Sequence, residues 1–197
     1  ANKEQRGYIT PQEFNLFAAQ AQTEIFEQYF YDEDQFERRL GSDINELLDQ
    51  KIQIFKQSHG ATTHAFTIPD TTHQIEYIYL HDSASERRTY VERVNGKDIN
   101  KIKSGSLLNN LSTVPVYWLR GNTIYFHPVN AHQNTLAGQG GSTLSYKLTL
   151  VRKPVKPNWT YLIGNNQNAL YNPTAGDHQD FELHVSEEAK LVIKILQ

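Results

Sequence analysis

A helix start near the N-terminus places the strongest constraint on how this sequence folds. Thr10 is a good N-cap residue, Pro11 suits the first helical position because its missing N–H would have no partner there, and Glu13 is placed to complete a capping box. Apolar residues then recur at helical spacing along one face: Phe14, Phe17, Ala18, Ala21, Ile25 and Tyr29. The pattern predicts a helix from Pro11 to about Tyr31.

The same helix carries further apolar residues outside that face. Leu16, Phe26 and Phe30 lie away from the main stripe, so more than one side of the helix is apolar. A helix of this kind is buried on more than one side, either within its own domain or against another subunit. This feature is the first indication of assembly.

Two more helices are predicted on either side of a central region. The acidic run at residues 32–34 breaks the first apolar pattern, and Gly41-Ser42-Asp43 predicts a second helix that runs to about Gln57 and ends at His59-Gly60. Near the C-terminus, Ser186-Glu187-Glu188 predicts the cap of a last helix. The apolar residues of that helix are Leu191, Val192, Ile195 and Leu196.

Between these helices the apolar residues alternate with a period of two, which predicts strands. The alternating segments lie at residues 64–68, 74–80, 88–94, 114–119, 123–127, 143–151 and 159–163. Arg120-Gly121-Asn122 predicts the clearest hairpin, and residues 98–103 predict a helical turn. Residues 152–157 contain two prolines, so they must be extended without forming a central strand.

The order of elements predicts an α+β fold. We expect N-terminal packed helices and a C-terminal helix that flank an antiparallel β-sandwich or barrel-like lobe. Residues 1–60 would form an arm and a helical hairpin, residues 61–163 the β-rich lobe, and residues 164–197 a loop and a helix that packs back on the helical part. The whole would be one structural unit.

Composition narrows the functional classes. The chain has 197 residues, of which 38% are hydrophobic, and its net charge of −3 argues against general nucleic-acid binding. No apolar run reaches the roughly 20 residues of a membrane span, and no secretion signal precedes the first helix, so we expect synthesis in the cytoplasm and no membrane association. The sequence ends within an apolar run, which predicts that the chain continues beyond Gln197.

No catalytic or metal-binding motif is present, so we expect neither an enzyme nor a cofactor. The glycine-rich residues 138–142 lack the Lys-Ser/Thr of a phosphate-binding loop, there is no cysteine, and the eight histidines show no metal-ligand spacing. A glycosidase that uses paired carboxylates ranks only third among the hypotheses, because nothing in the sequence indicates that the candidate carboxylates converge in one pocket. Those candidates are Glu13, Glu24, Glu27, Glu86 and Glu92.

Two surface features suggest contacts with partners. The basic run with Arg152, Lys153 and Lys156 is either an edge segment kept soluble by its charge or an arm that docks on an acidic neighbour. Tyr171, within the polar residues 164–180, is a candidate interface anchor. Other aromatic residues fit core packing better than stacking platforms for sugars or single-stranded nucleic acid; they are Tyr117, Trp118, Tyr125, Trp159 and Tyr161.

The two ends of the sequence resemble a known family. The opening RGYITPQEFN, followed by FAAQAQTEIFEQYF, resembles the N-terminus of virion neck proteins of tailed bacteriophages, including crAss-like and marine phages. The closing FELHVSEEAKLVIKIL is similar to their C-terminal pattern, a strand end followed by a capped apolar helix. In the middle, the likeness rests on the order of helices, strands and helix.

This resemblance implies a head–tail connector, an adaptor or ring protein of the virion neck. Such a protein forms a homo-oligomeric ring, commonly a dodecamer, that binds the portal protein and other neck or tail rings while viral DNA passes through the lumen. The alternative is a tail module that binds a receptor or glycan. The candidate subunit or portal contacts are Arg6, Tyr8, Phe26, Phe30, Arg152, Lys153, Lys156 and Tyr171.

Overall fold

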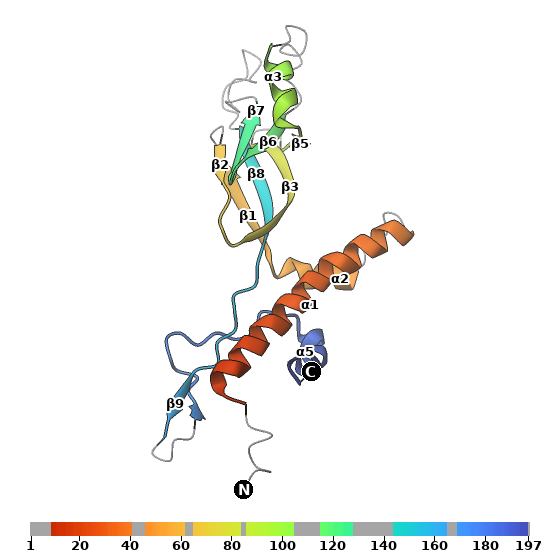
Figure 1. The fold of residues 1–197 in the computed structure, drawn as a ribbon. Coiled ribbons are helices and arrows are strands. Elements are labelled where there is room, and N and C mark those ends of the chain that lie inside the picture. The colour runs from red at the N-terminus through yellow and green to blue at the C-terminus, as the bar shows by residue number, and fades with distance from the viewer. Residues whose placement is uncertain are drawn as a thin grey trace. The chain divides into compact units, whose positions relative to one another are not determined.

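The chain forms two compact units (Figure 1). The computed structural model describes residues 9–40, 46–61, 65–83, 86–104, 115–127, 144–164 and 169–196. The helical unit comprises Ala1–Phe55 and Pro154–Gln197, and the β unit comprises Lys56–Lys153. The predicted α+β class is confirmed, because helices at both ends of the chain flank largely antiparallel strands.

The first helix, α1, spans Pro11–Leu40. Its predicted capping box forms: the Thr10 N–H donates to a Glu13 carboxylate oxygen at 2.9 Å, and the Glu13 N–H donates to the Thr10 hydroxyl oxygen at 3.2 Å. The predicted end near Tyr31 is wrong, because the helix continues through residues 32–34. These acidic residues are exposed and need no apolar pattern, and no Gly or Pro follows them within α1.

The second helix, α2 (Glu46–Gln53), buries Leu48 and Ile52. Its predicted extension to Gln57 is wrong, and so is the predicted helix end at His59-Gly60, because these residues belong to strand β1 (Lys56–Ala61). Every residue of β1 pairs with β8 (Leu144–Arg152). This ladder of backbone hydrogen bonds overrides the helical spacing of the few apolar residues in the segment.

The β unit contains two four-stranded sheets, and every strand predicted between residues 64 and 151 has described residues in one of them, although residues 64, 114 and 143 lie outside the described ones. The first sheet has the order β1-β8-β3-β4 and is antiparallel throughout, with β3 at Thr72–Asp82 and β4 at Arg88–Tyr90. The second has the order β2-β7-β6-β5. Its strands are β2 (Ala65–Thr67), β7 (Thr123–His127), β6 (Val116–Arg120) and β5 (Glu92–Arg93), and its β5–β6 pair is parallel.

One hydrophobic core lies between these two sheets, as expected of a sandwich. Ile78 and Leu148 enter it from the first sheet, and Ile124 and Phe126 enter it from the second. The Phe126 ring stacks on Tyr146 of β8 with a centroid separation of 4.2 Å. Burial raises the pKa of Tyr146 to about 12, so its hydroxyl stays neutral inside the core at physiological pH.

The strand predicted at residues 88–94 is divided between the sheets. Tyr90 pairs with Tyr79 in the first sheet, and Glu92 pairs with Val116 in the second. The buried Val91 lies at the change of sheet. A period-two pattern reports which residues face a core but not which sheet each residue joins, so the sequence did not reveal this change.

The predicted β6–β7 hairpin is confirmed. Gly121 adopts a φ of 60°, a left-handed conformation that glycine enters without a Cβ clash. The side chain of Asn122 donates to the Ile68 carbonyl at 2.7 Å and to Asp70 at 3.1 Å, which fixes the turn against the segment after β2. The predicted helical turn is a full helix, α3 (Gly96–Ser104).

The chain returns to the helical unit through an extended segment. The predicted last strand is β9 (Tyr161–Ile163), which pairs with β10 (Ala169–Tyr171) in a segment that the sequence indicated as loop. A short 3-10 helix, η3 (Val185–Glu187), then leads into α5 (Glu188–Leu196). The cap is His184 rather than Ser186, because the His184 ring accepts the Ser186 N–H at 3.2 Å.

Candidate functional site

Large apolar side chains are exposed mainly in the helical unit. Among the described residues, all of the exposed ones except Tyr77 and Tyr90 belong to this unit. They are Ile9, Leu16, Phe17, Tyr31, Leu47, Ile54, Val155, Leu162, Ile163, Leu170, Tyr171, Val185, Val192, Ile193 and Leu196. Concentrated apolar exposure on one part of a protein marks an interaction surface. Two parts of this surface have a defined shape.

The first part is a groove between α1 and α5, here called the α1–α5 groove. Ile9, Phe17 and Ala21 line it from the start of the chain, and Ile195 and Leu196 line it from α5. It encloses about 600 Å³. Phe17 is 44% exposed and Leu196 is 80% exposed, so both side chains are available to a partner.

The charges that line the groove neutralise each other. The Lys194 ammonium donates to a Glu24 carboxylate oxygen at 2.6 Å, and the Gln20 side chain donates to the other oxygen at 3.0 Å. The hydrogen bond from Lys194, and then that from Gln20, hold the pKa of Glu24 below its usual value. The groove therefore presents apolar side chains beside a closed ion pair.

The second part is the two-stranded β9–β10 hairpin. Leu162 lies opposite Leu170 in the register, and Tyr161 lies opposite Tyr171. Because successive side chains alternate between faces, the two leucines share one face and the two tyrosines share the other. Leu162 is 60% exposed and Leu170 is 59% exposed. One face of the hairpin is therefore an exposed pair of leucines.

The other face anchors the hairpin to α1. Trp159 stacks on Tyr171 with a centroid separation of 6.1 Å and on Tyr161 at 6.0 Å, and its edge meets the Phe14 ring at 5.9 Å. The Trp159 N–H donates to the Asn15 side-chain oxygen at 2.7 Å, and the Asn15 amide donates back to the Trp159 carbonyl at 3.1 Å. These contacts fix the base of the hairpin on the first turns of α1.

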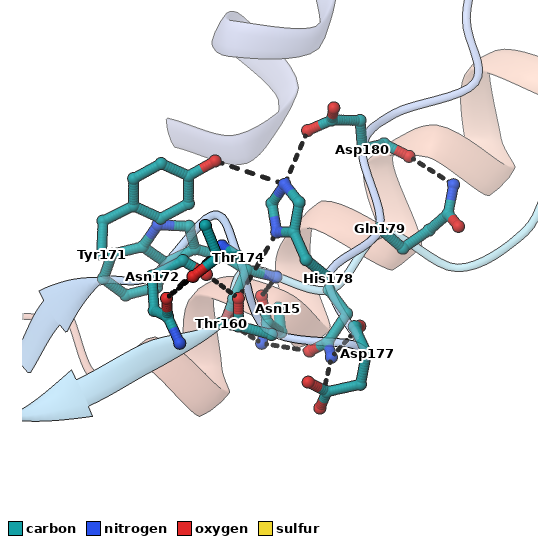
Figure 2. A network of polar contacts seen from close by, with 11 residues as sticks. Asn15, Thr160, Tyr171, Asn172, Thr174, Asp177, His178, Gln179 and Asp180 are labelled. Carbon is teal, nitrogen blue, oxygen red and sulfur yellow. Dashed lines mark hydrogen bonds and ion pairs between the residues drawn. The ribbon is translucent and has the colours of Figure 1, made fainter.

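A polar network closes around the same base (Figure 2). The Nε2 atom of His178 lies 3.2 Å from the Tyr171 hydroxyl and 3.2 Å from an Asp180 carboxylate oxygen. The Thr160 hydroxyl donates to the Asn172 carbonyl at 2.5 Å and lies 3.5 Å from His178 Nδ1. The Thr160 hydroxyl thus lies between the Asn172 carbonyl and the His178 ring. The network positions the hairpin.

Polar side chains join the segments of the helical unit. The buried Gln22 of α1 donates to the Val155 carbonyl at 2.7 Å and accepts the Glu182 N–H at 2.9 Å. The Glu182 carboxylate accepts the Val155 N–H at 2.7 Å. Lys51 of α2 forms an ion pair with Glu187 at 2.5 Å, with both side chains largely buried. These contacts hold the returning segment against α1 and α2.

The predicted contacts near the N-terminus have different environments. Arg6 and Tyr8 lie outside the described residues. Phe26 is 1% exposed and packs edge-on against Phe55 at 4.9 Å and against Phe30 at 5.0 Å. Phe26 therefore packs within its own helical unit, and Phe30 is partly exposed beside it.

The predicted basic run is divided between the two units. Arg152 and Lys153 end the β unit, where the Lys153 N–H donates to the Thr71 carbonyl at 2.7 Å. Lys156 belongs to the helical unit and is exposed. Tyr171, the predicted anchor, is 51% exposed and also holds the base of the hairpin.

Several surface residues escaped the sequence analysis. Helical spacing assigned Phe17 and Leu196 to apolar faces, but both side chains are exposed in the structure. Leu162 and Leu170, which are also exposed, were not identified from the sequence. A signal for the hairpin did exist. Two short apolar segments, YLI and ALY, flank the asparagine-rich residues 165–168, which is typical of a hairpin connection.

Two of the candidate carboxyl groups in α1, Glu13 and Glu24, have lowered pKa values. The hydrogen bonds from Thr10 hold the pKa of the Glu13 carboxyl below its usual value. The hydrogen bonds from Lys194 and Gln20 likewise hold the pKa of the Glu24 carboxyl below its usual value. A glycosidase acid needs the opposite shift. Among the described residues, no group of three or more His, Asp or Glu is placed to hold a metal ion, and no helix is long and apolar enough to cross a membrane.

No protein-family model matches the chain, and no curated protein matches it in sequence. Its function is therefore inferred from its own residues, and the exposed apolar side chains of the helical unit are the most informative of them.

Proposed function

We propose that the chain is a structural subunit of a ring in the neck of a tailed bacteriophage virion, which joins the portal to the tail. The observation that carries this proposal is the concentration of exposed large apolar side chains in the helical unit. Permanent interfaces between subunits are more apolar than ordinary protein surface. A subunit built for such an interface exposes its apolar side chains when it is alone.

The resemblance to virion neck proteins supports the proposal. Of the segments that carry it, residues 11–30 lie in α1 and residues 181–196 run to the end of α5, and both stretches belong to the helical unit. A ring requires two different contact surfaces on each subunit, because every copy binds one neighbour on each side. The α1–α5 groove and the β9–β10 hairpin supply two different surfaces.

The charge of the chain suits a conduit for DNA. The sequence carries 19 basic and 22 acidic residues, so each subunit of a ring would bring a net charge of −3. A protein that grips DNA neutralises its phosphates with clustered Lys and Arg. A ring of these subunits in the virion neck would let DNA pass through its lumen without binding it tightly.

The test is a mass measurement of the full chain alone and after mixing with assembled portal protein from the same phage. We expect a discrete complex with a fixed number of copies for each portal ring, twelve if the resemblance extends to stoichiometry. A chain that stays monomeric with and without the portal, at every concentration tested, would contradict the proposal.

The alternative, a tail module that binds a receptor or glycan, has one observation in its favour. The β unit contains a hollow of about 610 Å³ lined by Tyr117, Arg93 and Asp70, a combination of aromatic and polar side chains that suits a sugar. A glycan array probed with the full chain tests it. Binding that Tyr117→Ala abolishes, without loss of folding, would favour this alternative over the ring.

A further inference from the structure

The helical unit carries two surfaces whose shapes are opposite, a projecting hairpin and a groove. The β9–β10 hairpin pairs only with itself among the described residues. A lone two-stranded hairpin is marginally stable in water, and its outer edges leave backbone groups unpaired. The contacts of Trp159 and the polar network stabilise its base, yet Leu162 and Leu170 remain largely exposed. No described residue of the chain covers this leucine face.

The α1–α5 groove, like the leucine face, has exposed apolar side chains. Among the described residues, those of the start of the chain and of α5 line it, and strands β9 and β10 contribute none. Its volume of about 600 Å³ is in the range of pockets that accept several apolar groups. The paired strands of the hairpin therefore do not fill the groove of their own copy.

The chemistry of the two surfaces matches. Residues 161–171 of the hairpin segment include no charged side chain. The Glu24–Lys194 ion pair of the groove is already closed at 2.6 Å, so an uncharged partner would leave neither charge without its counterpart. A charged peptide would gain little there, because both charges of the groove are already paired.

We propose that the β9–β10 hairpin of one copy docks into the α1–α5 groove of the next copy, with Leu162 and Leu170 against Phe17 and Leu196. This inference rests on the proposed ring and names its subunit contact. Every copy supplies one hairpin and one groove, so the contact is head-to-tail and repeats around the assembly. Because both surfaces belong to the helical unit, that unit alone would carry the contact between subunits.

Two charge substitutions test this contact in the full chain. Leu162→Glu places a carboxylate on the hairpin, and Leu196→Glu places one in the groove. Leu196 is preferred to Phe17 because it is 80% exposed and its replacement removes little internal packing. We expect each variant to weaken self-association about 30-fold or more, as for an interface hot spot. The matched control is Tyr90→Glu, which replaces a large apolar side chain that is 78% exposed in the β unit and should associate like the original chain.

Mixing the two variants gives the sharpest outcome. Each variant alone should be monomeric, whereas the pair should form a one-to-one dimer, since the intact hairpin of the groove variant fits the intact groove of the hairpin variant. Sedimentation velocity measures the masses, and circular dichroism confirms that each variant is folded. A mixture that stays monomeric under conditions in which the original chain assembles overturns the proposed contact.

Failure of the contact and failure of the ring are distinguishable. If the original chain forms rings, alone or on the portal, and both glutamate variants form them equally well, the contact is wrong and the ring stands. If the original chain forms no assembly under any condition, the ring itself is wrong, and the contact is overturned with it.

Discussion

The two units of the chain bury their apolar side chains to different degrees. In the β unit, side chains of both sheets close around one core, and among the described residues only Tyr77 and Tyr90 remain as exposed large apolar groups. In the helical unit, α1 and α5 both carry large apolar residues that the described part of the chain leaves exposed. The described part of the β unit thus buries most of its large apolar side chains, whereas the helical unit has surfaces that suit a neighbour.

The units also differ in what holds them together. The sandwich relies on apolar packing, such as Phe126 on Tyr146. The helical unit relies to a larger extent on polar side chains that reach between segments, such as Gln22 and the Lys51–Glu187 pair. Buried polar groups of this kind fix one arrangement of segments, which is what a surface built for a specific partner requires.

The largest expected effect is in the core of the sandwich. Phe126→Ala removes a fully buried ring and should lower the free energy of unfolding of the β unit by about 3–5 kcal/mol. Leu170→Ala, at a position that is 59% exposed in the helical unit, should change the stability of the unassembled chain by less than about 1 kcal/mol. Urea denaturation measures both. Equal losses would remove the contrast between the units.

The next effect concerns the ion pair in the helical unit. Lys51→Met leaves the Glu187 carboxylate largely buried without its closest cation and should cost about 3 kcal/mol. The control is Lys101→Met, which breaks an exposed pair with Asp98 and should cost less than about 1 kcal/mol. Thermal unfolding compares the two, and a similar small loss in both would show that polar contacts do not hold the helical unit together.

Gln22 tests the same point through neutral hydrogen bonds. Gln22→Ala leaves the Val155 carbonyl and the Glu182 N–H without these partners and should cost about 1–3 kcal/mol. The Gln20 side chain donates to Glu24 at the exposed surface. Gln20→Ala should therefore lower the free energy of unfolding by much less than Gln22→Ala does. Chemical denaturation measures the free energy of unfolding of both variants. An equal loss for Gln20→Ala and Gln22→Ala would contradict the prediction.

The smallest effect depends on pH. The pKa of Glu24 is lower in the folded chain than in the unfolded one, so its pair with Lys194 stabilises the fold above the unfolded pKa, and this stabilisation is lost as the pH falls through the folded value. The unfolding temperature of the original chain should exceed that of Glu24→Gln at pH 7, and the difference should shrink as the pH falls through the folded pKa of Glu24. A difference that stays the same throughout an acid titration would contradict this role.

Much of the fold could be predicted from the sequence because local signals decide it. The Thr10 cap, the Gly121 turn and the alternating strands each depend on neighbouring residues. The boundary at Lys56 could not be predicted, because β1 exists through pairing with β8, almost a hundred positions later in the chain. The sheet change at Val91 has the same origin, since it depends on which distant strand lies alongside.

The candidate site was predicted less well, again for physical reasons. Helical spacing shows that Phe17 and Leu196 are on apolar faces, but it does not show whether another segment covers those faces. Phe26 carried the same kind of signal and is fully buried against Phe55. Only the packing of the unit separates the residues that serve its core from those left for a partner.

Amide hydrogen exchange, compared between the free chain and its assembly, measures directly which unit contacts its neighbours. We expect new protection at the β9–β10 hairpin, at α5 and at the first turns of α1, with little change in the strands of the β unit. Protection confined to the β unit, with the hairpin and α5 exchanging as in the free chain, would contradict the central claim that the helical unit is completed by neighbouring copies.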